Sequence, residues 1–276
     1  MNNLTYYING QFIKSKDAKI AFQDGGFQRG NAIFESIRFR NNTLFHVKKH
    51  LQRLRYGLNY LEFNLEKKDK ELIDLMVLTI NKNSLKSGIL NLMVSSNFDI
   101  NNPLNSIINL YISIREIKSI DHEPVKVIFL NEWDFPILRF RNSIKINSYA
   151  GNIKGLVTAK KKNAFDAVFF NQEKQITEAT MRNIFFIKNE LIITPPLSLG
   201  ILPGITRNLI LELCGEHGYD YKEKIIKFDE IGDMDEAFLT SSSYGVIPCY
   251  WKGWLNQNKK TKKIKKLLDN KLLKEV

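Results

Sequence analysis

Short segments in which apolar and polar residues alternate, each bounded by a turn, cluster along this chain instead of alternating regularly with helices. Residues 4–15 show the pattern well, because two such segments flank the Asn9-Gly10 pair, which favours the tight turn of a β-hairpin. Strands that cluster in this way pair with their neighbours in mixed or antiparallel sheets. The pattern therefore predicts an α+β fold in which helices flank mixed or antiparallel sheets.

The first half of the chain predicts one such sheet. Along the strand expected at 32–40, the even-numbered residues from Phe34 to Arg40 share one face, and the odd-numbered residues from Glu35 to Phe39 share the other. The strand is followed by a turn at Asn41-Asn42. Further along the first half we expect helices at 47–63 and 68–83 and strands at 89–96 and 107–115.

The polar, proline-containing stretch 116–124 predicts a boundary between two domains. We expect an N-terminal α/β domain at 1–117, an interdomain linker at 118–124, and a C-terminal domain at 125–276 that ends in a lysine-rich helix. The second half predicts strands at 125–130, 142–149, 166–171, 175–179, 183–189, 191–196 and 236–243, and helices at about 150–163 and 205–217.

Composition excludes several classes of protein. With 43% hydrophobic and 25% charged residues, the chain is typical of a globular protein, and it contains no run of 18 apolar residues that would span a membrane. The N-terminus lacks the pattern of a signal peptide. The two cysteines, Cys214 and Cys249, have no paired spacing and suit neither a metal site nor a disulfide framework. We therefore expect a cytoplasmic protein.

The net charge of +12 raises the question of a nucleic-acid partner. Residues 252–276 hold nine lysines against two acidic residues, so this segment carries seven of the twelve net charges. The same segment has an apolar stripe at helical spacing, from Ile264 to Leu273. A lysine-coated helix that packs by its apolar side is the simpler interpretation, with nucleic acid or a membrane surface as the alternative.

Three segments could bind phosphate. The Pro-Gly turn of 203–204 leads into a helix at Ile205-Thr206, which gathers backbone N–H groups and a hydroxyl at one point. A second segment is the run of hydroxyl residues at 240–243. The third is Arg53, whose guanidinium can donate two hydrogen bonds to phosphate oxygens. The chain has neither a dinucleotide-binding glycine motif nor a P-loop. Each segment alone would also fit ordinary surface structure.

Taken together, these motifs resemble a known family. The stretch from Ile176 to Cys214, with the motifs E-x4-N-I-F, T-P-P and L-P-G-I-T-R, is similar to the class IV (fold type IV) pyridoxal-phosphate enzymes, as are "HLQRL" at 50–54 and "DEAFLTSSSYGVIP" at 235–248. The family includes branched-chain aminotransferases, D-amino-acid aminotransferases and aminodeoxychorismate lyases. The resemblance runs from about Tyr7 to Pro248. It implies a homodimer with pyridoxal 5'-phosphate at the domain interface.

The resemblance also implies roles for single residues. Counting back from Glu178 by the family's spacing leads to Lys145 as the lysine that bonds the cofactor and shuttles the substrate proton. Glu178 would face the pyridine nitrogen, and Tyr149 would bond the phenolic oxygen, unless it is a core tyrosine. The phosphate would be held by Arg53, Ile205, Thr206, Ser242 and Ser243.

The substrate side is less constrained. The family positions that line the pocket correspond to Phe34, Ser36 and Arg38, although Arg38 would also fit a solvent-facing strand arginine. Arg29 falls where branched-chain members carry an aromatic residue from the neighbouring subunit. At 95–97 the chain reads Ser-Ser-Asn, so the Arg-Gly pair of many transaminases is missing, which counts against a typical D-amino-acid aminotransferase.

Three functions follow from these observations. The short chain favours an aminodeoxychorismate lyase, which forms 4-aminobenzoate and pyruvate for folate synthesis. The alternative on the same scaffold is an aminotransferase of branched-chain or other amino acids that uses 2-oxoglutarate. A more remote alternative is a cationic binding protein that has no catalytic activity.

Overall fold

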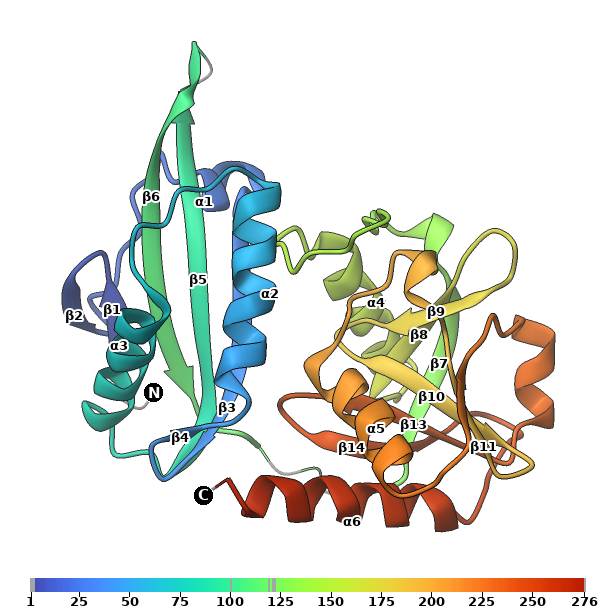
Figure 1. The fold of residues 1–276 in the computed structure, drawn as a ribbon. Helices are drawn as coiled ribbons and strands as arrows, with labels where there is room; N and C mark the ends of the chain where they lie inside the picture. Colours follow the sequence, from blue (N-terminus) through green and yellow to red (C-terminus); the bar gives the residue numbers. More distant parts are fainter. Residues whose placement is uncertain (1–2, 100, 119, 121–122, 276) are drawn as a thin grey trace. The chain divides into compact units, whose positions relative to one another are not determined.

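The structure is a computed structural model that describes residues 3–99, 101–118, 120 and 123–275. The chain forms two compact units, which are coloured along the sequence in Figure 1. The first comprises Met1–Lys118, Ile144–Ser148 and Glu275–Val276, and the second comprises Ser119–Ser143 and Tyr149–Lys274. The segment Ile144–Ser148 was expected in the C-terminal domain. It belongs to the first unit because its backbone pairs with residues 32–34.

A six-stranded antiparallel sheet in the order β2-β1-β6-β5-β3-β4 forms the first unit. The turns Asn9-Gly10 and Asn41-Asn42 close two hairpins of this sheet, and all four residues have the positive φ that tight hairpin turns use. Both predicted hairpins are confirmed. The strands are β1 (Thr5–Ile8), β2 (Gln11–Lys14), β3 (Ala32–Arg40), β4 (Thr43–Leu44), β5 (Ser87–Asp99) and β6 (Asn102–Arg115).

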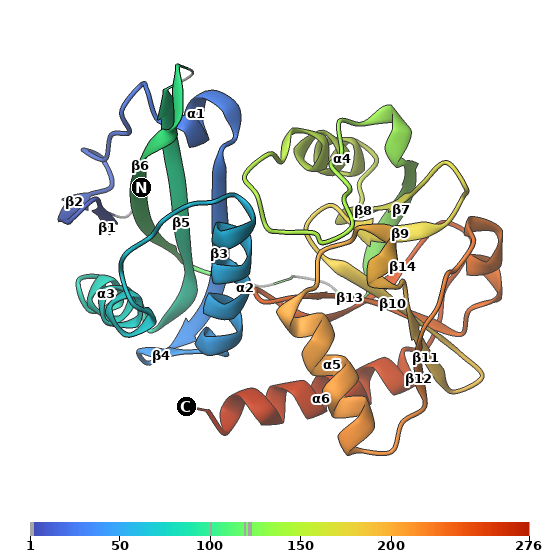
Figure 2. The same ribbon diagram turned by 45° about the horizontal axis from the view of Figure 1, so that its top comes forward.

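Two helices pack on this sheet (Figure 2): α2 (Val47–Tyr60) along β3, and α3 (Asp69–Asn81) against β1 and β6. The leucine stripe of α2 is buried, as its spacing predicts. Gly57 allows the close approach of α2, because an added Cβ would lie 2.9 Å from Cδ1 of Ile33. A short helix, α1 (Gly25–Arg29), is capped by the Asp24 side chain, which accepts a hydrogen bond from the N–H of Phe27.

An eight-stranded mixed sheet in the order β12-β11-β10-β13-β14-β7-β8-β9 forms the second unit. The pairs β11–β12, β14–β7 and β7–β8 are parallel, and the other pairs are antiparallel. The predicted α+β class with mixed and antiparallel sheets is therefore confirmed. The strands are β7 (Val125–Asn131), β8 (Asp166–Phe170), β9 (Ile176–Ala179), β10 (Asn183–Lys188), β11 (Leu191–Thr194), β12 (Tyr221–Glu223), β13 (Glu236–Ser241) and β14 (Gly245–Tyr250).

The helices of the second unit cover this sheet. Helix α4 (Ala150–Lys161) packs on β7 and β8, whereas α5 (Ile205–Glu216) and α6 (Lys259–Leu273) pack on each other and on β13. The lysine-rich helix α6 buries Ile264 and Leu268 among apolar side chains of α5, β10 and β13, as the apolar stripe predicts. Three 3₁₀ helices complete the unit: η1 (Glu132–Asp134), η2 (Leu197–Leu199) and η3 (Phe228–Asp233).

The prediction of a strand at 142–149 is wrong. Only Ile146 pairs there, in an isolated antiparallel bridge with Ile33 of β3. The alternation of isoleucines reflects this one-sided contact, because the chain leaves β3 after the bridge and enters α4 at Ala150. Lys145 therefore lies in a short extended segment and not in a regular strand.

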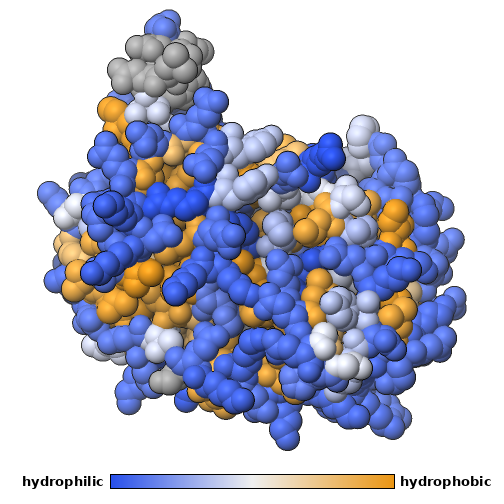
Figure 3. All heavy atoms as spheres, viewed as in Figure 1, coloured by the Kyte–Doolittle hydropathy of each residue, from blue (hydrophilic) through white to orange (hydrophobic). Residues whose placement is uncertain are grey.

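The face of the protein shown in Figure 3 is mainly polar. Hydrophilic side chains cover most of the face shown in Figure 3, and apolar side chains form smaller patches between them. Within the described ranges of the chain, every helix is too short or too polar to cross a membrane.

Candidate functional site

The predicted catalytic lysine lies beside β3 in the first unit. The carbonyl of Lys145 accepts a hydrogen bond from the N–H of Phe34 at 3.0 Å, and the N–H of Asn147 donates to the carbonyl of Ala32 at 2.9 Å. These two bonds hold the half-buried Lys145 against the strand. Its Nζ lies 4.3 Å from the centre of the Phe34 ring. The structure thus brings Lys145 next to one of the predicted substrate residues.

The three predicted substrate residues on β3 share one face. Phe34, Ser36 and Arg38 are half-buried, and the residues between them are buried. The Ser36 hydroxyl donates to Oδ1 of Asn91 at 2.7 Å, and the Arg38 guanidinium lies 6.0 Å from the centre of a phenylalanine ring. Arg29 lies on a different element, because it is the exposed last residue of α1.

Arg53 on α2 is bound to the opposite face of β3. Its Nε and Nη2 each donate to a carboxylate oxygen of Glu35 at 2.7 Å, and Nδ1 of His50 lies 2.6 Å from Oε2 of the same carboxylate. Burial alone would raise the pKa of Glu35, but the Arg53 charge and the hydrogen bonds from Arg53 and His50 outweigh it and hold the pKa at about 2. A phosphate contact of Arg53 would thus use its Nη N–H groups, because Glu35 occupies the Nε–Nη2 fork.

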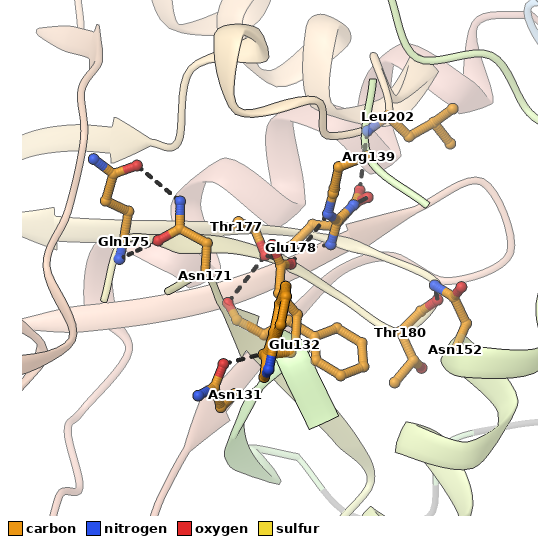
Figure 4. Close-up of polar contacts among 12 residues, drawn as sticks. Asn131, Glu132, Arg139, Asn152, Asn171, Gln175, Thr177, Glu178, Thr180 and Leu202 are labelled. Atoms are coloured by element: carbon orange, nitrogen blue, oxygen red, sulfur yellow. Dashed lines mark hydrogen bonds and ion pairs between the residues drawn. The ribbon is translucent and has the colours of Figure 1, made fainter. Parts of the chain in front are cut away.

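Glu178 in the second unit accepts three hydrogen bonds although it is only 8% exposed on β9. Arg139 donates to Oε1, while Nδ2 of Asn183 and the N–H of Leu202 each donate to Oε2 at 3.2 Å. Figure 4 shows Arg139 and Leu202 approaching the carboxylate from different segments. This arrangement fixes the orientation of Glu178.

Arg139 links Glu178 to a second carboxylate. Its Nε donates to Oε2 of Glu132 at 3.1 Å, and its Nη2 lies 3.3 Å from the hydroxyl of Thr177 (Figure 4). Burial would lower the pKa of Arg139, but Glu178 and Glu132 outweigh it and raise that pKa, so the guanidinium stays charged. The charge of Arg139 compensates for the buried carboxylate of Glu178 and the half-buried carboxylate of Glu132.

The predicted phosphate turn is buried and begins α5. Gly204 is the N-cap residue and offers no side chain to the helix, and Thr206 is only 6% exposed. The first N–H groups of a helix have no intrahelical acceptor and lie at the positive end of its dipole. Arg207, 1% exposed, anchors this turn through Glu223 at 2.6 Å and the carbonyl of Pro195 at 3.0 Å. The turn therefore fits a phosphate group.

The remaining predicted cofactor residues lie on two other elements of the second unit. Ser242 and Ser243 are half-buried in the turn between β13 and β14. Tyr149, also half-buried, is the N-cap residue of α4, and its side chain makes no capping hydrogen bond.

Several partners of these residues could not be predicted from the sequence. Arg139 lies in no motif, and it reaches Glu178 across 39 residues of sequence only in the folded chain. Asn183 belongs to the E-x4-N-I-F motif, but no role followed from the motif. Glu35 did carry a signal, because it shares its predicted strand face with the apolar Ile37 and Phe39, and a carboxylate on an apolar face needs a partner.

The sequence is similar to those of known proteins. The sequence model of the family described as amino-transferase class IV matches residues 32–250. A putative branched-chain-amino-acid aminotransferase of Methanocaldococcus jannaschii is 26% identical over 270 residues, which cover 96% of this chain and 94% of the relative. A D-alanine aminotransferase of Staphylococcus aureus is 26% identical over 257 residues, which cover 88% of this chain and 86% of the relative.

Solved structures share the fold. The branched-chain amino acid aminotransferase of Escherichia coli superposes with a TM-score of 0.88 at 20% identity, over 98% of this chain and 94% of that one. A putative 4-amino-4-deoxychorismate lyase of Legionella pneumophila gives a TM-score of 0.82 at 26% identity, over 93% of this chain and 96% of that one. Both likenesses extend across the two sheets.

Proposed function

The chain belongs to the class IV aminotransferase family, and from this premise we infer that it transfers the amino group of an amino acid to a 2-oxo acid. It is an enzyme of this family with fold type IV, and its cofactor is pyridoxal 5'-phosphate, as the resemblance predicts. The roles of single residues and the substrate are the parts that we propose.

One observation carries the proposal: the buried Glu178 carboxylate is fixed by Arg139, Asn183 and the N–H of Leu202, and Leu202 lies two residues before the N-cap Gly204 of the phosphate turn. A fixed carboxylate fits the ring nitrogen of pyridoxal phosphate, and a helix N-terminus without a side-chain cap fits its phosphate. The residues present therefore fit both ends of the cofactor.

Each residue then has a definite task. Bound pyridoxal phosphate supplies an electron sink that stabilises negative charge at the substrate α-carbon. Glu178 keeps a proton on the ring nitrogen, and Nζ of Lys145 removes the α-proton and returns it. The N–H groups at Ile205 and Thr206, with the Thr206 hydroxyl, bind the phosphate. Arg53, Ser242 and Ser243 contribute further phosphate contacts, and Tyr149 bonds the phenolic oxygen.

The sequence favours a lyase, but the relatives support the aminotransferase alternative better. The two sequence relatives described above are named for amino-group transfer and match almost the full length of the chain. We therefore place branched-chain or other amino acids, with 2-oxoglutarate as acceptor, ahead of aminodeoxychorismate. Phe34, Ser36 and Arg38 would line the substrate pocket and Arg29 would lie at its edge.

Purified protein tests the proposal directly. We expect a yellow colour from the cofactor that is lost in Lys145→Ala, and glutamate formation from 2-oxoglutarate with leucine. D-alanine in place of leucine tests the second kind of amino donor. A colourless protein that pyridoxal phosphate cannot reconstitute would contradict the cofactor assignment, and absence of glutamate with every amino donor would contradict the transfer reaction.

The lyase remains a second candidate because of two observations. The Legionella pneumophila structure is 26% identical over most of the chain, and Ser95 and Ser96 stand where many transaminases carry an Arg-Gly pair. The same preparation should therefore be given aminodeoxychorismate. Release of 4-aminobenzoate without glutamate formation from any amino donor would favour the lyase.

The assembly and location are also proposals. A homodimer would follow the family pattern, and light scattering of the purified protein measures its mass. The two cysteines are buried and free, which is compatible with the cytoplasmic location that the sequence predicts.

A further inference from the structure

Asn183, the first residue of β10, joins Glu178 to the segment that leads into the phosphate turn. It is only 4% exposed. Its Nδ2 donates to Oε2 of Glu178 at 3.2 Å and to the carbonyl of Leu202 at 2.9 Å, while the N–H of Leu202 donates to the same Oε2 at 3.2 Å. Three groups thus form a closed set of hydrogen bonds, in which the carboxamide uses both of its N–H groups.

The other side of the carboxamide touches the turn itself. An added Cβ at Gly204 would lie 2.1 Å from Oδ1 of Asn183. Gly204 has φ −64° and ψ 134°, a conformation open to any residue, so its backbone does not require glycine. Glycine is required at this position because the Asn183 side chain leaves no space for a Cβ atom. The turn is therefore packed directly against this side chain.

Asn183 also has a backbone link to the run of hydroxyl residues at 240–243. It pairs with Thr240 of β13, and the chain continues from Thr240 into the turn that carries Ser242 and Ser243. One residue consequently contacts the carboxylate, the Leu202–Gly204 chain and the strand that leads to the serine turn.

We propose that Asn183 is a positioning residue that fixes Glu178 and the phosphate turn at one separation, so that the two ends of the cofactor are bound as a unit. This inference rests on the proposed function. Without the carboxamide, Glu178 keeps Arg139 and the N–H of Leu202, but the carbonyl of Leu202 loses its donor and the turn loses its packing partner. The phosphate end would then move relative to the ring end.

The two ends can be separated by comparing pyridoxal phosphate with pyridoxal, which lacks the phosphate. Both are titrated into cofactor-free Asn183→Ala and wild type, and binding is followed by the colour. We expect the affinity for pyridoxal phosphate to fall by about tenfold or more, as for loss of a hydrogen bond to a charged group, and the affinity for pyridoxal to fall less. Asn183→Asp keeps the shape of the side chain but loses both N–H donors, so its affinities for the two compounds should fall as in Asn183→Ala.

Asn152→Ala is the matched control. Its Nδ2 donates to the carbonyl of Thr180 at 2.7 Å, two residues after Glu178 in sequence (Figure 4). We expect this variant to keep the wild-type ratio of the two affinities. A purely structural role of Asn183 would lower the melting temperature and leave that ratio unchanged, and this result would overturn the inference.

Gly204→Ala provides an independent test that needs no cofactor. In wild type the added methyl meets Asn183, so the variant should lower the melting temperature of the cofactor-free protein. In the Asn183→Ala background the obstacle is gone, and the nearest remaining side-chain atom is Cβ of Arg207 at 3.4 Å, so the same change should have little effect. Equal effects in the two backgrounds would overturn the inference. A wild-type protein that fails to bind pyridoxal phosphate would overturn the proposed function instead, because the melting test does not depend on it.

Discussion

At the scale of single residues, the buried carboxylate of Glu35 determines how Arg53 is oriented. The pKa of Glu35 is lowered to about 2 from an ordinary 4.5, mainly because the charge and the hydrogen bonds of Arg53 outweigh the effect of burial. A carboxylate with a depressed pKa stabilises the folded state above its unfolded pKa, and this contribution is lost as the pH falls toward the folded pKa. The pair therefore stabilises the protein at neutral pH and loses this effect between about pH 4.5 and 2.

We expect Glu35→Gln to flatten the acid dependence of stability. The contribution of Glu35 to the free energy of unfolding should decrease by about 2 kcal/mol between pH 7 and pH 3 in wild type, and this part should be absent in the variant. At pH 7 the variant should be less stable by about 3–5 kcal/mol, because the charged Arg53 side chain, only 10% exposed, loses its carboxylate partner. Urea unfolding at the two pH values measures both effects. Glu66→Gln, at an exposed carboxylate, is the control, and an unchanged acid dependence in Glu35→Gln would contradict the assignment.

Residue-scale prediction from sequence succeeded where a motif or an alternation was available. The alternation along β3 placed Phe34, Ser36 and Arg38 on one face, and the burial pattern confirms it. The roles of Lys145 and Glu178 came from the resemblance and stay predictions. The partner of Glu178 could not be foreseen, because Arg139 lies in no motif and only the tertiary fold brings it to the carboxylate.

At the scale of elements, the same residue type has opposite roles in two helices of the second unit. Gly155 in α4 faces the sheet, and an added Cβ would lie 2.5 Å from Cζ of Phe169, which is fully buried. Gly215 in α5 has room, because the nearest atoms to an added Cβ lie 3.7 Å away in Tyr221. The elements themselves were predictable from periodicity, but such contacts between them were not. The strand prediction for 142–149 was wrong for the same reason, because alternation of apolar residues does not tell how many neighbouring strands will pair with a segment.

The two glycines should respond oppositely to alanine. Gly155→Ala gains helix propensity but must displace a packed ring, and we expect a net loss of about 1–2 kcal/mol in stability. Gly215→Ala gains the propensity without the clash and should stabilise by about 0.5 kcal/mol, because it lies near the end of α5. Denaturant midpoints at constant slope measure both changes. Stabilisation by Gly155→Ala would mean that α4 does not pack on β8 as described.

At the scale of the whole molecule, the positive charge is concentrated in the C-terminal segment, where several lysines also make ion pairs that hold the helix α6. Residues 252–276 carry most of the net charge, yet several of these lysines are engaged. Lys260 contacts Glu190 at 2.9 Å, Lys265 contacts Glu123 at 2.7 Å, and Lys271 contacts Glu216 at 3.1 Å. The apolar side of the helix is buried. A basic tail built in this way is part of the fold of the second unit.

The two interpretations of α6 can be separated with paired variants. Leu268→Ala removes a side chain that is 1% exposed, and we expect a loss of about 2–5 kcal/mol in stability. Replacing the exposed Lys262, Lys263 and Lys266 by Gln should change the free energy of unfolding by less than about 1 kcal/mol, because exposed charges contribute little. The triple variant should also keep the rate of glutamate formation. Duplex DNA binding that falls steeply with salt in wild type and is lost in the triple variant would instead favour a nucleic-acid role for this helix.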